Sequence, residues 1–274
     1  MNNFDKFPVL CDLDGVVWLA HQPIAGSVEA VSRLRQAGHR VVFVTNNSSA
    51  TRREQEDALA AVGISATGDV ITSAMAGASL VQSGESVLVC GGPGIEEELR
   101  DRGARVVTYA EAKTGGSALL MSIDTVMVGF HRWFDYDVMR CAAEATRHGA
   151  RLVGTNDDAT YPTPNGPIPG GGSILSAIAT ASGLDPVIAG KPHRAMADLV
   201  RNLVFGVDER TVMVGDRPST DGRFATTVGC RYALVRSGVT TRDMNPDSHP
   251  RAFDQVRVDL DVASLAAVAE LLLS

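Results

Sequence analysis

The sequence predicts an α/β fold in which a parallel sheet forms a three-layer core with helices on both faces. Short β-branched apolar runs alternate with helical stretches along the 274 residues. Successive positions within these runs are apolar, which is typical of parallel strands buried on both faces. The length suits two domains of roughly 100–200 residues each better than a single domain.

The first third of the chain shows this alternation in its simplest form. Two of its helical stretches stop at Gly38 and Gly63, and glycine commonly closes a helix. We expect strands at 7–11, 40–44 and 70–72, and helices at 28–36, 52–62 and 74–82.

The same alternation continues to the end of the chain and is interrupted by one long loop. Residues 156–172 are rich in Pro, Gly, Asn and Asp, and a loop longer than about 12 residues is often functional. We expect strands at 87–90, 106–109, 125–129, 151–154, 187–189, 211–214 and 231–235, and helices at 94–102, 136–148, 173–181, 195–203, 220–228 and 262–273.

Composition and charge exclude several classes of protein. With 45% hydrophobic and 21% charged residues, the chain has the composition of a globular protein. Lys and Arg number 25 against 32 Asp and Glu, so the net charge of −7 attracts neither nucleic acid nor a membrane surface. We do not expect residues 1–7 to form a signal peptide, and no apolar run approaches the ~18 residues that span a bilayer. The four dispersed cysteines lack CxxC spacing, so we expect reduced thiols and a cytoplasmic protein.

Four polar clusters follow predicted strands. Ligands bind at the carboxyl ends of the strands in open parallel sheets, so we expect the clusters to meet in one crevice. They are Asp12-Leu13-Asp14-Gly15, Thr45-Asn46-Asn47-Ser48, Lys191-Pro192, and Gly215-Asp216 with Asp221.

The acidic residues of these clusters predict a cation site. Asp12 and Asp14 point to the same side of an extended chain, and their repulsion favours a shared proton or a bound cation. Asp216 would add a third carboxylate, and such an oxygen site suits Mg²⁺. The six histidines show no zinc-binding spacing.

The same clusters predict phosphoryl-transfer chemistry. A carboxylate that attacks phosphorus forms an acyl-phosphate, and Asp12 is the candidate because it comes first after the strand. Asp14 could protonate the leaving alcohol and later deprotonate water. Lys191 would neutralise phosphoryl charge, while Thr45 and Asn46 offer donors just before a helix whose free N–H groups favour an anion.

Each motif alone also has a purely structural interpretation. Aspartate caps helices and turns, residues 45–49 could simply cap the next helix, and a Gly-Lys-Pro sequence is common. The glycine-rich stretches at 91–94 and 170–173 lack the GxGxxG and P-loop patterns, and we interpret them as turns. The four clusters in this order, each after an apolar run, nevertheless favour catalysis.

Five motifs together resemble the haloacid dehalogenase (HAD) superfamily. Within it, the chain is similar to the NagD-like subclass IIA phosphatases, which include 4-nitrophenyl, phosphoglycolate, glycerol-phosphate and pyridoxal phosphate phosphatases. The motifs are CDLDGVVW (11–18), FVTNNSS (43–49), TNDDATYPTPNGPIPGGGSI (155–174), AGKP (189–192) and VGDRPSTD (214–221).

This resemblance implies a HAD-like Rossmannoid core at 1–80 and 186–274, with an inserted α/β cap domain at 81–185 that closes over the substrate. It implies a Mg²⁺-dependent phosphatase of small phosphorylated metabolites that works through an aspartyl-phosphate, and a homodimer formed through the cap. The resemblance implies that Asp12 is the nucleophile and a metal ligand, and that Asp14 is the general acid/base and a metal ligand through its backbone carbonyl. It implies that Lys191 orients the phosphoryl group, which Thr45, Asn46 and Asn47 also bind. Asp216 would be a further metal ligand, and Asp221 would support the metal site.

Two departures from the subclass concern the metal and the substrate. Pro218 and Ser219 replace a more acidic sequence in the fourth motif, so one acidic side chain near the metal is missing. Asp157 occupies a position where the subclass usually has proline, which adds negative charge to the cap loop.

Three other functions compete with the phosphatase hypothesis. A phosphotransferase or mutase would use the same intermediate, with a sugar hydroxyl in place of water. A catalytically silent protein could use the crevice to bind phosphate esters. A phosphorylated receiver-type switch also combines an acidic pair, a Thr or Ser and a Lys, but the Asp-x-Asp spacing and the inserted segment disfavour it.

Overall fold

The computed structural model describes residues 6–161, 163, 165–246, 248–254 and 256–274. The chain divides into two compact units. The first unit comprises Met1–Thr45, Arg53–Ile71 and Lys191–Ser274, and the second comprises Asn46–Arg52 and Thr72–Gly190.

The first unit is built on a six-stranded sheet with the order β15-β14-β13-β1-β4-β5. The pairings from β15 through β4 are parallel, with Cys11 of β1 opposite Val214 of β13 and Phe43 of β4. A short antiparallel hairpin of β2 and β3 follows β1. The strands are β1 (Val9–Cys11), β2 (Trp18–Leu19), β3 (Gln22–Pro23), β4 (Val41–Thr45), β5 (Val70–Thr72), β13 (Val212–Gly215), β14 (Arg231–Val235) and β15 (Leu260–Val262).

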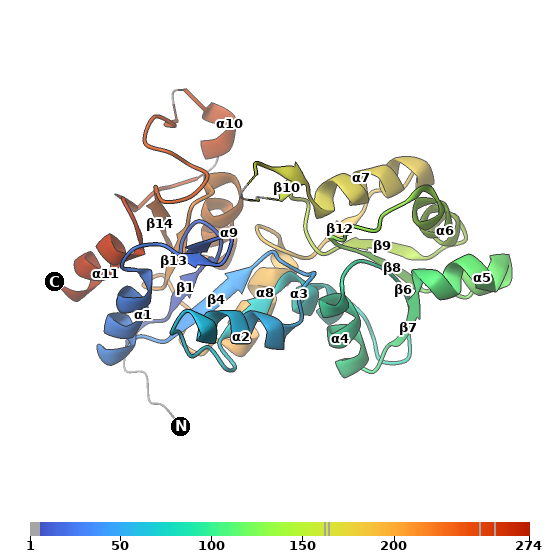
Figure 1. Cartoon of the computed structure of the whole chain (residues 1–274), viewed down its shortest axis with the longest axis horizontal. Coiled ribbons are helices and arrows are strands. Elements are labelled where there is room, and N and C mark those ends of the chain that lie inside the picture. Colours follow the sequence, from blue (N-terminus) through green and yellow to red (C-terminus); the bar gives the residue numbers. More distant parts are fainter. Residues whose placement is uncertain (1–5, 162, 164, 247, 255) are drawn as a thin grey trace. The chain divides into compact units, whose positions relative to one another are not determined.

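Helices cover this sheet because alternate side chains of its apolar strands point to opposite faces. One face packs against α1, α2 and α11 in a core that includes Val9, Phe43 and Val214. Figure 1 shows α1 and α11 side by side, in agreement with their many contacts. The helices are α1 (Ser27–Gln36), α2 (Arg52–Ala61), α8 (Arg194–Leu203), α9 (Arg223–Val228), α10 (Pro250–Phe253) and α11 (Leu265–Leu273), with a π-helical turn, η1, at Pro218–Gly222.

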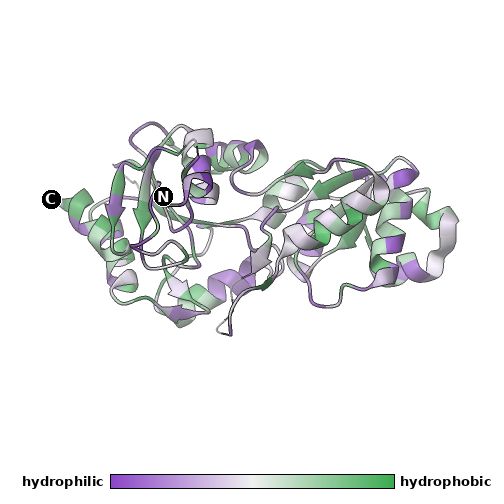
Figure 2. Ribbon diagram, turned by 90° about the horizontal axis from the view of Figure 1, so that it is seen from above, coloured by the Kyte–Doolittle hydropathy of each residue, from purple (hydrophilic) through white to green (hydrophobic). Residues whose placement is uncertain are grey.

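The second unit has its own parallel sheet, with the order β12-β9-β8-β6-β7. In Figure 2 the hydrophobic residues gather on the strands of both units, as expected for strands covered on both faces. The strands are β6 (Ser86–Cys90), β7 (Arg105–Thr108), β8 (Thr125–Val128), β9 (Arg151–Gly154) and β12 (Val187–Ile188), with an antiparallel pair of β10 (Thr160–Tyr161) and β11 (Ile168–Pro169).

The helices of the second unit lie on both faces of its sheet and bury separate apolar clusters. On one face, α5, α6 and α7 pack on a cluster that contains Leu88, Val126 and Leu152. On the other, α3 and α4 pack on a cluster that contains Val89 and Met127. The helices are α3 (Ser73–Ser79), α4 (Pro93–Asp101), α5 (Tyr109–Leu120), α6 (Tyr136–Arg147) and α7 (Gly171–Ser182).

The predicted α/β class with parallel sheets is confirmed, but several elements differ from expectation. The β2–β3 hairpin, α10 and β15 were not predicted, and the helix expected at 262–273 begins only at Leu265, after β15. Helix α5 is not apparent in the sequence because Gly115 and Gly116 interrupt its periodicity, and Gly116 has a non-helical backbone. The strand expected before Lys191 is β12, which pairs with β9 in the second unit and not in the core sheet. The helix expected at 220–228 begins only at Arg223, after the π-helical turn.

The loop expected at 156–172 contains the antiparallel β10–β11 pair. Pro162 and Pro164 of this loop lie outside the described residues. All four cysteines are free thiols, and Cys11, Cys90 and Cys141 are buried. Within the described residues, no helix is long and apolar enough to cross a membrane.

Candidate active site

The candidate site forms where the central strand β1 and its neighbour β13 end. The strand order changes direction here, because β4 lies on one side of β1 and β13 on the other. Ligands bind at such switch points in open α/β sheets. The Asp12 N–H donates to the Val214 carbonyl at 2.9 Å, so Asp12 continues the ladder beside the residues that lead to Asp216.

Lys191 lies buried between two of the predicted aspartates. Its Nζ is 2.9 Å from Asp12 Oδ1 and 2.7 Å from Asp221 Oδ1. The side chains of Lys191 and Asp221 are each 1% exposed, whereas that of Asp12 is 14% exposed. Asp12 is therefore the carboxylate of this trio that a ligand can reach most readily.

The π-helical turn brings Asp221 into the site. Pro218 fits the first turn of η1 because a proline there removes no intrahelical hydrogen bond. The Asp221 Oδ2 accepts the Arg217 backbone N–H at 3.1 Å, so both of its oxygens have partners. A Cβ at Gly215 would lie 2.2 Å from Asp221 Cβ, so only glycine permits this close approach.

Asp216 is held by two glycine-containing loops. Its Oδ2 accepts the Val239 backbone N–H at 2.5 Å. A Cβ at Gly15 would lie 2.4 Å from this oxygen, and one at Gly238 would lie 2.0 Å away. The other oxygen, Oδ1, is buried and has no hydrogen-bond partner among the described residues, which is costly for a carboxylate.

These carboxylates fit a hard divalent cation. Asp12, Asp216 and Asp221 each offer an oxygen, and these oxygens lie within 4.8 Å of one another. The unpartnered Asp216 Oδ1 is the kind of atom that a cation would satisfy, and oxygen-only donor sets suit Mg²⁺. Because both Asp221 oxygens are engaged, Asp12 and Asp216 are the better ligands of the three.

Burial and mutual repulsion perturb the protonation of these groups. Burial raises the pKa of Asp12 well above its ordinary value, and the charges of Asp221 and Asp216 add to this although Lys191 opposes it. Burial, and then Asp221, raise the pKa of Asp216 from 3.8 to about 7. Burial alone would lower the pKa of Lys191, but Asp12 and Asp221 outweigh it, so Lys191 remains charged.

Asp14 lies close to this trio but differs in its surroundings. Burial raises the pKa of its carboxyl, while His21 and the Trp18 side chain partly oppose the rise. A carboxyl group whose pKa is raised can hold a proton near neutral pH, as a general acid requires.

The second predicted cluster is divided between the two units. Thr45 is buried at the end of β4, in the first unit. Asn46 and Asn47 belong to the second unit, where the Asn46 side-chain amide donates to Asp158 Oδ2 at 3.0 Å. The Asn46 carbonyl accepts from the side chains of Ser73 and Asn156, at 2.7 and 2.8 Å.

The sequence reasoning missed the loop that follows β14. This loop supplies the Val239 N–H to Asp216, and the Ser237 hydroxyl donates to the Gly15 carbonyl at 2.7 Å. The signal was the Ser-Gly pair at 237–238, which follows an apolar strand as the four recognised clusters do. It was missed because it carries no acidic or basic side chain.

Comparison with known families agrees with this geometry. A family profile described as haloacid dehalogenase-like hydrolase matches residues 9–105. A second profile, described as HAD-hydrolase-like, matches residues 188–263.

Relatives and solved structures extend the similarity to most of the chain. The 5'-nucleotidase YutF of Bacillus subtilis is 35% identical over 243 residues, which cover 87% of this chain and 90% of that protein. The D-glycerol 3-phosphate phosphatase of Mycobacterium tuberculosis is 35% identical over 238 residues, which cover 85% of this chain but only 64% of that longer protein. The crystal structure of a glycerol phosphate phosphatase from Mycobacterium tuberculosis in complex with magnesium matches with a TM-score of 0.82 and 32% identity, covering 97% of this chain and 78% of that one.

Proposed function

The chain belongs to the haloacid dehalogenase-like hydrolases, and on that premise we propose that it is a phosphatase of small phosphomonoesters. The observation that carries this proposal is the pairing of the accessible Asp12 with the buried Lys191, beside the unpartnered Asp216 Oδ1. The relatives act on glycerol 3-phosphate and on 5'-nucleotides by name, so the substrate proposed here is a phosphate ester of a small metabolite, such as glycerol phosphate, phosphoglycolate or a sugar phosphate.

In the first step, an Asp12 carboxylate oxygen attacks the phosphorus of the ester and forms an aspartyl-phosphate. The bond between phosphorus and the ester oxygen breaks, and Asp14 donates its proton to the departing alcohol. The raised pKa of Asp14 supports this role, because the group can then hold the proton until it is needed.

In the second step, water attacks the same phosphorus and Asp14 takes up the proton of that water. The bond between phosphorus and Asp12 breaks, which releases inorganic phosphate and restores the free carboxylate. Asp14 thus returns to its protonated form, and the cycle neither gains nor loses a proton on the protein.

Lys191 favours the ionised form of Asp12 and holds this nucleophile in place. Its ammonium group lies 2.9 Å from Asp12 Oδ1 and lowers the pKa that burial would otherwise raise further. Asp221 anchors Lys191 from the other side at 2.7 Å. A magnesium ion held by Asp12, Asp216 and the Asp14 carbonyl would neutralise charge on the phosphoryl oxygens.

Three further parts of the proposal concern the second cluster, the second unit and the cellular setting. Thr45, Asn46 and Asn47 would donate hydrogen bonds to the phosphoryl group. The second unit would act as a cap over the substrate and as the contact of a homodimer. The four free thiols support a cytoplasmic setting, because reducing compartments preserve them.

The test is hydrolysis of 4-nitrophenyl phosphate and glycerol 3-phosphate, with Mg²⁺ or with EDTA. We expect Asp12→Asn to lower kcat at least about a thousandfold without unfolding the protein. Asp57→Asn is the matched control, since Asp57 lies exposed on α2 and pairs only weakly with Arg53. Full activity of Asp12→Asn would refute the proposal, and tight ester binding by the wild type without turnover would favour the silent binding protein. Phosphate transfer to added alcohols at the expense of hydrolysis would indicate a phosphotransferase.

A further inference from the structure

The loop that begins at Arg236, directly after β14, reaches the acidic site through its backbone. Its Val239 N–H donates to Asp216 Oδ2 at 2.5 Å. Its Ser237 hydroxyl donates to the Gly15 carbonyl at 2.7 Å. Since Asp216 Oδ2 is engaged by the loop, Oδ1, which has no hydrogen-bond partner among the described residues, is the oxygen of this carboxylate that can serve a cation.

This loop has little regular structure to hold it in place. Within the described stretch 236–246, the backbone forms neither helix nor strand. Segments without such ladders of hydrogen bonds open locally at a lower free-energy cost than core strands do. The position of the Val239 N–H therefore depends on the side chains that fasten the loop.

Arg236 fastens the loop at its far end. Its Nη1 donates to the Thr241 carbonyl at 2.8 Å and to the Met244 carbonyl at 2.7 Å. On its other side, Nε donates to Asp261 Oδ1 at 2.7 Å and Nη2 donates to Asp261 Oδ2 at 2.6 Å. The Arg236 side chain is only 10% exposed. One side chain thus ties the loop to β15 of the core sheet.

These contacts require a guanidinium group. Its five donors lie in one plane, so two of them can meet a carboxylate in parallel while others remain free for carbonyl groups. A lysine ammonium has its three donors at a single point and cannot span Asp261 and both carbonyls. The hydrogen bonds to the Asp261 carboxylate also raise the pKa of Arg236, so the group stays charged.

On the premise of the magnesium site in the proposed function, we propose that Arg236 is a positioning residue for that site. By tying the loop to β15, Arg236 keeps the Val239 N–H on one oxygen of Asp216 and leaves the other oxygen for the cation. Residues that support metal ligands in this way typically account for about ten- to a hundredfold in metal affinity.

The closed loop and the cation must then stabilise each other. If only the closed loop completes the site, the apparent dissociation constant of Mg²⁺ rises by the inverse of the closed fraction. A closed fraction of about one tenth in the absence of the Arg236 contacts would therefore weaken Mg²⁺ about tenfold. Because such coupling is reciprocal, bound Mg²⁺ must in turn oppose opening of the loop.

The first experiment uses the full-length wild type and requires no variant to fold. Amide hydrogen exchange of the stretch 237–244 is measured by mass spectrometry in EDTA and in saturating Mg²⁺. We expect Mg²⁺ to slow this exchange about tenfold and to leave the exchange of α6 in the second unit unchanged. Equal exchange of 237–244 with and without Mg²⁺ would overturn the role of the loop.

The second experiment is calorimetric titration of Mg²⁺ into variants of the full-length chain. Arg236→Met should weaken Mg²⁺ about ten- to a hundredfold and speed the exchange of 237–244 in EDTA. Arg236→Lys keeps the positive charge but lacks the planar fork, so it should also bind Mg²⁺ more weakly than the wild type does. Saturating Mg²⁺ should restore kcat in both variants, because it closes the loop.

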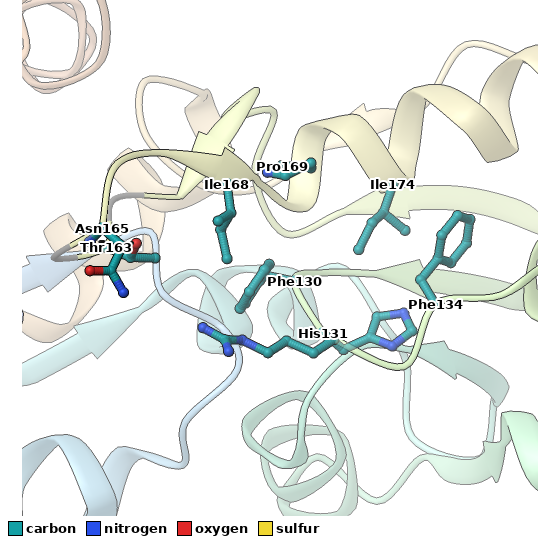
Figure 3. Close-up of a pocket in the computed structure, with 9 residues that line it drawn as sticks. Phe130, His131, Phe134, Thr163, Asn165, Ile168, Pro169 and Ile174 are labelled. Carbon is teal, nitrogen blue, oxygen red and sulfur yellow. Dashed lines mark hydrogen bonds between the residues drawn. The ribbon is translucent and has the colours of Figure 1, made fainter.

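Two arginine substitutions serve as matched controls. Arg257→Met removes an exposed ion pair with Asp259, just before β15. Arg132→Met removes an arginine that lines a pocket of the second unit, where Figure 3 labels its neighbour Phe130. Neither control should change the affinity for Mg²⁺.

The outcomes separate this role from a merely structural one and from the phosphatase proposal. A folded Arg236→Met protein that is less stable in urea but binds Mg²⁺ as tightly as the wild type would overturn the positioning role alone. A wild type that binds no Mg²⁺ would overturn it together with the magnesium part of the proposed function. Mg²⁺ binding that depends on Arg236 in a protein without turnover would support the positioning role and count against the phosphatase.

Discussion

Asp216 makes the metal-free protein sensitive to pH in a predictable direction. Its pKa is about 7 in the folded protein against an ordinary value of 3.8. Between these values the folded state binds more protons at this site than the unfolded state does. The free energy of unfolding that this group contributes is therefore largest at low pH and falls as pH rises toward 7 and above.

The magnitude follows from the same two values. Each pKa unit corresponds to about 1.4 kcal/mol, so the full effect of Asp216 is about 4 kcal/mol. Between about pH 5.5 and about pH 8, linkage gives a loss of about 2 kcal/mol. Bound Mg²⁺ would hold Asp216 ionised, so the metal should remove most of this pH dependence.

The assay is urea denaturation in EDTA at both pH values, for the wild type and for Asp216→Asn. Asparagine resembles the protonated carboxyl but does not titrate. The difference between the two proteins therefore cancels other groups such as His131, whose lowered pKa acts in the opposite direction. We expect the wild type to lose about 2 kcal/mol more than the variant over this range. An identical pH dependence in both proteins would refute the reasoning.

Three further predictions concern the same site. Lys191→Met should lower the free energy of unfolding by about 3–5 kcal/mol at neutral pH, as urea denaturation would show, because it leaves buried carboxylates without their cation. Gly15→Ala should destabilise the protein by more than Gly68→Ala in thermal unfolding: both glycines have a positive φ, but a Cβ at Gly68 meets nothing and one at Gly15 meets Asp216. Asp14→Asn should slow the single-turnover release of glycerol from glycerol 3-phosphate by about 10²–10⁴-fold and the release of 4-nitrophenolate much less, because that leaving group needs no proton; equal losses in these two release steps would contradict the role of a general acid.

The sequence predicted the acidic cluster well because its signals are local. Asp12 and Asp216 directly follow strands that are apolar on both faces, and parallel strands end at one edge of their sheet. Because β1 and β13 are neighbours in the sheet, the two carboxylates that follow these strands lie close together.

The parts that sequence reasoning missed depend on tertiary contacts. Nothing local distinguishes β12 as a strand of the second sheet, because its pairing with β9 is decided by a partner more than thirty residues away. The Val239 N–H contributes through its backbone alone, so no side-chain pattern identifies it. The ring nitrogens of His131 likewise have no hydrogen-bond partner among the described residues, which follows from the packing of aromatic side chains around the ring and not from any local sequence pattern.

The buried thiol of Cys11 can report local opening of the site. The thiol directly precedes Asp12, is fully enclosed, and donates to the Asp12 carbonyl at 3.3 Å. Burial raises the pKa of this thiol, so alkylating reagents can reach a reactive thiolate only when β1 opens. The rate at which Cys11 is alkylated therefore measures how often β1 opens locally, and no engineered probe is required.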